Sequence, residues 1–127
     1  MNLALWIAAG LLAAVALLSG SFKTFVPKEK LAKAPGAGWV EHVGAGTVKT
    51  IGVLELSAAV GLILPALLDI VPVLVPVTAV GWALLMAGAI VTHVRLREYP
   101  SIGANAVYLA LAAFIAWGRF VIEPFTG

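Results

Sequence analysis

The sequence predicts an all-α, polytopic membrane protein: a bundle of four transmembrane helices with a short interfacial segment between the first two. The first observation is composition, because 62% of the 127 residues are hydrophobic and only 11% are charged. Soluble domains are near half apolar and a quarter charged. The second is a mean hydropathy of +1.08. Such a chain has more apolar surface than one small domain can bury. The third is the presence of four apolar segments about twenty residues long, the length that crosses a hydrocarbon core of about 30 Å.

The first predicted span covers residues 3–22, which contain no charged side chain. A secretory signal peptide is the alternative, but no basic region precedes this segment and its apolar run is too long. We therefore expect a retained transmembrane helix.

Residues 23–47 form the longest polar segment. Pro27 predicts the start of a short helix, and residues 34–38 (Ala-Pro-Gly-Ala-Gly) predict a turn. Trp39 and its valine neighbours indicate a segment in the headgroup layer, where Trp is favoured. The adjacent Glu41 and His42 are too few ligands to predict a metal site.

The remaining spans are predicted at residues 48–68, 72–92 and 101–120. Pro65 should break the second span near its end, whereas Pro72 and Pro76 fall near the first turn of the third, where proline is tolerated. We expect one domain over residues 1–127.

The charged residues predict the orientation. One set of loops is basic and the other contains only Arg119. Because cytoplasmic loops carry an excess of Lys and Arg, we expect a plasma (inner) membrane protein with both termini outside and the Lys-rich loop in the cytoplasm. The basic set is Lys23, Lys28, Lys30, Lys33, Lys49, Arg95 and Arg97.

Composition also excludes several classes of function. The chain has no cysteine, so disulfides, CxxC thiol chemistry and thiolate metal sites are excluded. A formal charge of +2 is too small to indicate nucleic-acid binding. Any redox role would require a cofactor that the chain does not encode.

Glu55 is the most informative residue, because it lies about seven residues inside the second span, roughly 10 Å below the surface at 1.5 Å per residue. A carboxyl group at that depth must face protein or water, and it often marks function. Gly52, Ala58 and Ala59 share its helix face, and small residues favour close helix packing. Glu55 is therefore predicted to point inward.

The same periodicity predicts a polar cluster in one leaflet. Its candidate residues are Lys23, Glu55, Trp82, His93, Asn105 and Tyr108. Glu55 has two interpretations: a structural ion pair with His93 or Lys23, or a site for a ligand, proton or partner. Trp82 is expected mainly to pack, although its indole N–H requires an acceptor.

Three arginines lie near the ends of the predicted helices. Arg95 and Arg97 are interpreted mainly as topology signals, with contacts to lipid phosphates as the alternative. Arg119 is expected to extend outward to the interface.

Several short motifs resemble the DoxX-like family: Lys23, Gly52-Val-Leu-Glu-Leu56, Gly88-Ala-Ile-Val-Thr-His-Val-Arg95 and Trp117-Gly-Arg119. The resemblance covers nearly the whole chain. It implies a four-helix membrane protein in which Glu55, His93 and Arg95 match the family positions. Members resemble the small subunit of a thiosulfate:quinone oxidoreductase, and a wider circle includes a membrane chaperone for acetylcholine receptors.

Three functional hypotheses follow, and none assigns a catalytic residue. We favour an accessory or assembly subunit that docks on a membrane protein partner, or on a second copy, through Gly- and Ala-rich helix faces. The alternative is a module that binds a quinone-like or lipid-like molecule at the Glu55 and His93 cluster, as a subunit of a quinone-linked oxidoreductase; quinone is then the cofactor. A third is a small dimeric transporter.

Overall fold

The structure is a computed structural model that describes residues 1–33 and 38–124. Within these residues, four helices are long and apolar enough to cross a membrane, as predicted. They are α1 (Asn2–Phe25), α3 (Ala45–Leu67), α4 (Leu74–Arg95) and α5 (Tyr99–Trp117), the last continued by the π-helical turn η2 (Gly118–Ile122). Two short helices, α2 (Lys28–Leu31) and the 3₁₀-helix η1 (Gly38–His42), connect α1 to α3. Residues 34–37 of the predicted turn lie outside the described residues.

The prolines explain where the helices differ from the predicted spans. Pro65 does not break α3, which continues to Leu67. Proline removes one helical hydrogen bond, a loss that transmembrane helices tolerate. Pro72 precedes α4, and Pro76 is the third residue of that helix. The first turn of a helix has no intrahelical acceptors for its N–H groups, so proline is accommodated there. Pro27 caps the N-terminus of α2, as predicted.

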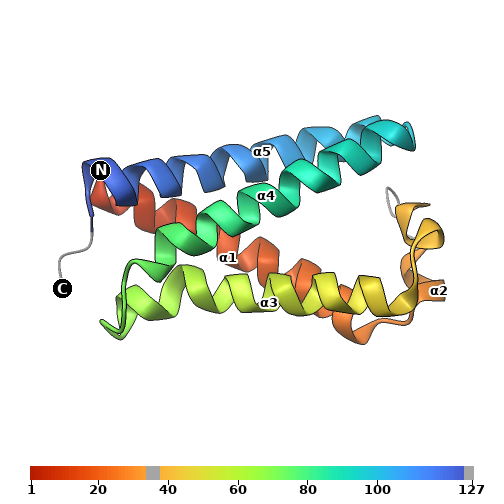
Figure 1. Cartoon of the computed structure of the whole chain (residues 1–127), viewed down its shortest axis with the longest axis horizontal. Coiled ribbons are helices and arrows are strands. Elements are labelled where there is room, and N and C mark those ends of the chain that lie inside the picture. The colour runs from red at the N-terminus through yellow and green to blue at the C-terminus, as the bar shows by residue number, and fades with distance from the viewer. Residues whose placement is uncertain (34–37, 125–127) are drawn as a thin grey trace.

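The four long helices pack as two pairs, α1 with α3 and α4 with α5 (Figure 1). The pairs contact each other around a core in which alanines are mixed with larger apolar side chains, and the alanines allow the helices to approach closely. This core contains Ala8, Ala9, Leu12, Ala16, Leu62, Val75, Ala79, Trp82, Met86, Ala112 and Ile115.

Within the first pair, α1 and α3 approach closely at Gly20 and Gly52. A Cβ atom added to Gly20 would lie 2.8 Å from the carbonyl oxygen of Gly52, and one added to Gly52 would lie 2.9 Å from that of Gly20. Because both neighbours are backbone atoms, neither position can accept a larger residue without moving a helix. This contact fixes the register of α1 against α3.

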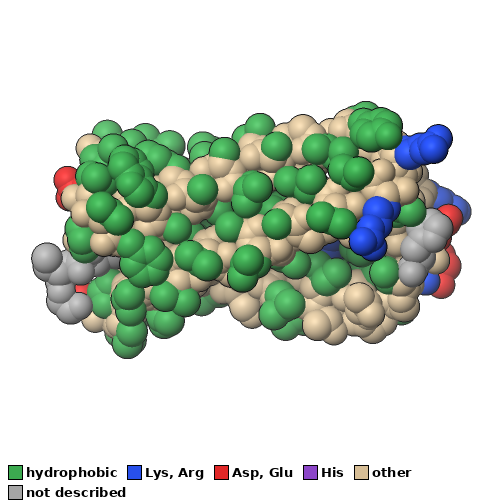
Figure 2. Space-filling model, turned by 45° about the horizontal axis from the view of Figure 1, so that its top comes forward, with side chains coloured by type: hydrophobic (Ala, Val, Ile, Leu, Met, Phe, Trp, Pro, Cys, Tyr) green, Lys and Arg blue, Asp and Glu red, His purple; other side chains and the backbone are tan. Residues whose placement is uncertain are grey.

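The two ends of the bundle differ in charge. The start of α1 and the end of α5 lie at one end, and α2, η1 and the junction between α4 and α5 lie at the other (Figure 1). On the face shown in Figure 2, Lys and Arg gather at the end that carries α2, while apolar side chains cover the middle. We call the α2 end the basic end. The apolar belt is the surface expected of a protein embedded in lipid.

Candidate binding site between the helix pairs

A cavity of about 570 Å³ lies in the basic half of the bundle, between the α1–α3 pair and the α4–α5 pair. Its volume is within the range of about 300–1,000 Å³ typical of small-molecule sites. All four long helices contribute side chains, together with η1 and the residue that follows it. The six residues of the predicted polar cluster all line it: Lys23, Glu55, Trp82, His93, Asn105 and Tyr108.

The cavity exists because α3 and α4 separate toward the basic end. Thr78 of α4 packs directly against Gly61 of α3. The residues that follow Thr78 by 7, 10 and 14 positions lie on the same face of α4 as Thr78. These are Leu85, Gly88 and Thr92, and all three line the cavity. The face of α4 that touches α3 near one end of the bundle therefore faces open space near the other.

Lys23 and Glu55 form an ion pair across the α1–α3 contact. The Lys23 Nζ atom lies 2.6 Å from Glu55 Oε1 and 2.7 Å from Ser19 Oγ. Side chains on a helix tilt toward its N-terminus, so the lysine extends back by one turn, away from the basic end and into the bundle. The Glu55 side chain is 1% exposed and that of Lys23 is 20% exposed. Of the two partners that the sequence allowed for Glu55, the structure provides Lys23.

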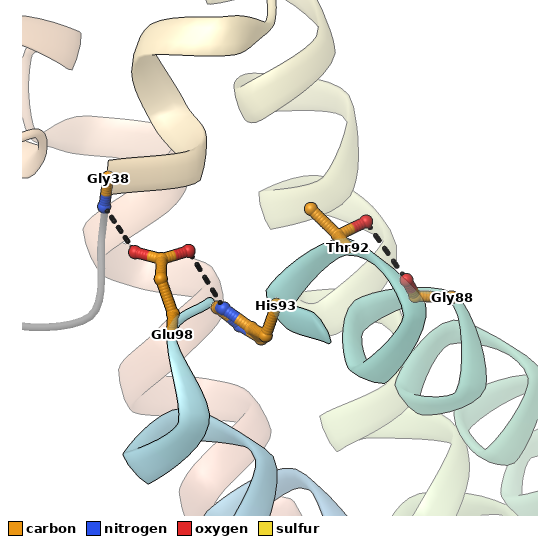
Figure 3. Close-up of polar contacts among 5 residues, drawn as sticks. All are labelled: Gly38, Gly88, Thr92, His93 and Glu98. Carbon is orange, nitrogen blue, oxygen red and sulfur yellow. Dashed lines mark hydrogen bonds and ion pairs between the residues drawn. The ribbon is translucent and has the colours of Figure 1, made fainter. Parts of the chain in front are cut away.

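His93 has a different partner, Glu98, whose Oε1 atom lies 3.1 Å from His93 Nδ1 (Figure 3). The end of α4 explains this contact between residues five positions apart. Arg97 has a positive φ of 57°, its N–H donates to the Val94 carbonyl, and the Glu98 N–H donates to the His93 carbonyl at 2.8 Å. This is the Schellman motif, which places the residue after the left-handed position beside the third-last helical residue. Glu98 was not among the residues predicted for the site, because helical periodicity does not extend past the end of a helix.

Glu98 also holds the segment that covers the basic end of the cavity. Its second oxygen, Oε2, accepts a hydrogen bond of 3.0 Å from the backbone N–H of Gly38, the first residue of η1 (Figure 3). Trp39 and Val43 from this segment line the cavity, and Lys23 Nζ lies 5.7 Å from the centroid of the Trp39 ring. We call residues 38–43 the strap. Its tryptophan was predicted to lie at the interface, but not to form part of the site.

Three buried polar atoms of residues that line the cavity have no hydrogen-bond partner among the described residues. They are Glu55 Oε2, Trp82 Nε1 and the amide nitrogen of Asn105. Glu55 and Trp82 are 1% and 2% exposed. An unsatisfied buried polar group costs about 1–3 kcal/mol, so a partner inside the cavity would stabilise each of them. The walls of the cavity thus contain one unpaired acceptor and two unpaired donors.

The three arginines lie away from this cavity. Arg95 and Arg97 are exposed at the end of α4 and do not line it. Arg119 is 5% exposed on η2, so it does not extend outward as expected. It donates from Nη1 to the carbonyl of Glu123, and its guanidinium lies 6.0 Å from the centroid of the Trp6 ring. The π-helical turn places it inside the bundle, against α1.

Four apolar helices of spanning length, an apolar belt and a polar site within the bundle define an integral membrane protein of the four-helix class. The model of the DoxX-like family matches residues 7–115. The chain therefore belongs to the DoxX-like family, as its motifs indicated. No curated protein and no solved structure matches the chain.

Proposed function

We propose that this protein is an intramembrane binding protein that holds the head group of a small amphiphilic molecule between its helix pairs. One observation carries the proposal: three residues that line one cavity of about 570 Å³ each have a buried polar atom without a partner among the described residues. Structural polar groups in a bundle are normally satisfied by each other. Here the Lys23–Glu55 pair is formed, and one carboxylate oxygen remains for a further donor.

The remaining lining suits the apolar part of such a molecule. Val15, Leu18, Ile51 and Leu85 contribute aliphatic surface around the polar groups. A mostly apolar pocket with a few convergent polar atoms is the usual form of a small-molecule site. A quinone-like molecule belongs to this class, because its ring is apolar and its oxygens accept hydrogen bonds. In this proposal the chain binds and orients the molecule, and any electron transfer involves a partner.

The accessory role is a weaker proposal for this chain. Gly20 and Gly52 are buried against each other inside the bundle, so this small-residue contact joins two helices of the chain and is not open to a partner. The exposed apolar belt suits lipid and identifies no particular protein. We therefore place binding first, and docking on a partner or on a second copy second.

The membrane and the orientation are also part of the proposal. We infer that the protein lies in the plasma (inner) membrane with the basic end in the cytoplasm. The support is the charge difference between the two ends and the positive-inside rule. Arg95 and Arg97 are exposed at that end, where lipid phosphates are within reach.

Native mass spectrometry of the gently extracted protein tests binding. A Cβ atom added at Gly88 or at Gly81 has no heavy atom within 4 Å, so a side chain can start at either position without a clash, but only Gly88 lines the cavity. We expect a bound small molecule on the native chain and on Gly81→Leu, and its loss from Gly88→Leu. A native chain without any bound small molecule, or a molecule retained on Gly88→Leu, would contradict the proposal.

A further inference from the structure

We propose that the cavity selects an uncharged amphiphile whose head group carries both a hydrogen-bond acceptor and a hydroxyl donor. This inference rests on the proposed binding function and specifies its ligand class. It is drawn from the charges, from the unpaired polar atoms and from the exposed residues at the edge of the cavity.

The charges in the cavity already balance. Among the described residues that line it, Lys23 and Glu55 carry opposite charges and contact each other at 2.6 Å. His93 is held by Glu98, which lies outside the lining. An anionic head group would therefore meet the free oxygen of the Glu55 carboxylate. A cationic head group would compete with Lys23 for the same carboxylate, and breaking a buried pair is costly.

The unpaired atoms define the hydrogen bonds that the head group must make. Trp82 Nε1 and the Asn105 amide nitrogen are donors, so they require an acceptor such as a carbonyl oxygen. An ionised carboxylate only accepts hydrogen bonds, so Glu55 Oε2 requires a donor such as a hydroxyl group. A neutral head group with both functions satisfies these atoms without adding a charge.

The edge of the cavity indicates where the apolar chain lies. Two leucines that line it are also largely exposed on the outside of the bundle, Leu18 at 63% and Leu84 at 70%. Leu18 belongs to α1 and Leu84 to α4, so the cavity reaches the lipid-facing surface through the side of the bundle. The chain of the amphiphile can thus remain in the hydrocarbon while its head group enters between the helix pairs.

A competition between three twelve-carbon amphiphiles tests the selection: monolaurin, laurate and dodecyltrimethylammonium. Monolaurin is neutral and carries an ester carbonyl and hydroxyl groups, whereas the others are an anion and a cation. The three are mixed at equal concentration with the detergent-solubilised protein at about pH 9, far above the usual pKa of a carboxylic acid. Native mass spectrometry then counts the complexes by mass. We expect monolaurin to occupy the native chain and Gly81→Leu about tenfold more than either ion, and to be lost from Gly88→Leu.

Trp82→Phe tests the donor directly, because it removes the indole N–H and keeps an aromatic ring. We expect monolaurin binding to weaken by up to about tenfold, the ratio that corresponds to one net hydrogen bond. Preference for laurate or for the ammonium ion, or unchanged binding by Trp82→Phe, would overturn the inference and leave the binding function standing. Absence of all three probes from the native chain, or equal binding to Gly88→Leu, would overturn the proposed function as well.

Discussion

Lys23 and Glu55 belong to different helices and meet 2.6 Å apart inside the bundle, each three residues after the glycine at which its helix contacts the other. Gly20 and Gly52 bring the two backbones together, and the ion pair forms beside that contact. The packing of the helices and the charge of the site are thus coupled, and the predictions below separate them.

Removing one partner of the Lys23–Glu55 ion pair should destabilise the protein more than removing both. Lys23→Met leaves Glu55 buried without its partner, which we expect to destabilise the bundle by about 3–5 kcal/mol. Replacing both partners, as in Lys23→Met/Glu55→Leu, should cost less than the single change, because no buried charge remains. Unfolding of the detergent-solubilised protein measures these differences. Lys30→Met, at an exposed position on α2, is the control and should change stability little.

The separate partners of Glu55 and His93 give a second expectation. Because His93 contacts Glu98 and Glu55 contacts Lys23, the stability effects of Glu55→Gln and His93→Gln should be closer to additive than those of Lys23→Met and Glu55→Gln. A double-mutant cycle measures both couplings. A larger coupling energy between Glu55 and His93 than between Glu55 and Lys23 would show that Glu55 interacts with His93 and not with Lys23.

The glycine contact predicts a difference between two alanine substitutions. A Cβ atom at Gly52 would lie 2.8 Å from the backbone nitrogen of Thr24, so Gly52→Ala should force α1 and α3 apart and lower stability by about 1–3 kcal/mol. Gly10→Ala is the matched control, because its Cβ meets no atom within 4 Å and alanine favours a helix. We expect equal or higher stability for that variant in the same unfolding assay. Equal destabilisation by both would contradict the close packing.

Glu98 should control the strap over the cavity. Glu98→Ala removes the acceptor for the Gly38 N–H and the partner of His93 together. We expect faster hydrogen exchange in residues 38–43 and little change in the middle of α4. Glu41→Ala, an exposed change within the strap itself, should leave the exchange of the Gly38 amide unaltered. Unchanged exchange at Gly38 in Glu98→Ala would show that the carboxylate does not hold the strap.

Single cysteines test the orientation, because the chain has no cysteine of its own. Lys30→Cys marks the basic end and Asn2→Cys marks the opposite end, and both positions are exposed. We expect an impermeant thiol reagent to label Asn2→Cys in intact cells, and Lys30→Cys only after the membrane is opened. The reverse pattern would place the basic end outside.

Hydropathy was sufficient to predict the four helices, because each apolar segment is about twenty residues long, the length that crosses the hydrocarbon core. Periodicity also predicted that Glu55 faces inward, since its small neighbours share one face of α3. Glu98 and Trp39 escaped prediction for a physical reason. They reach the site from a helix end and from a connecting segment, where the 3.6-residue repeat does not apply. The choice of Lys23 as the partner of Glu55 depends on the register of two helices, which their separate patterns do not define.

The pairing of helices that are neighbours in the chain has a consequence for biogenesis. α1 packs on α3 and α4 packs on α5, so the protein can enter the bilayer as two helical hairpins. Lys23 and Glu55 both belong to the first hairpin. Their charges can therefore neutralise each other while α4 and α5 are still being synthesised. The first hairpin can thus insert into the bilayer with its ion pair formed, before the second hairpin is present. The second hairpin then completes a site whose charged half is already assembled.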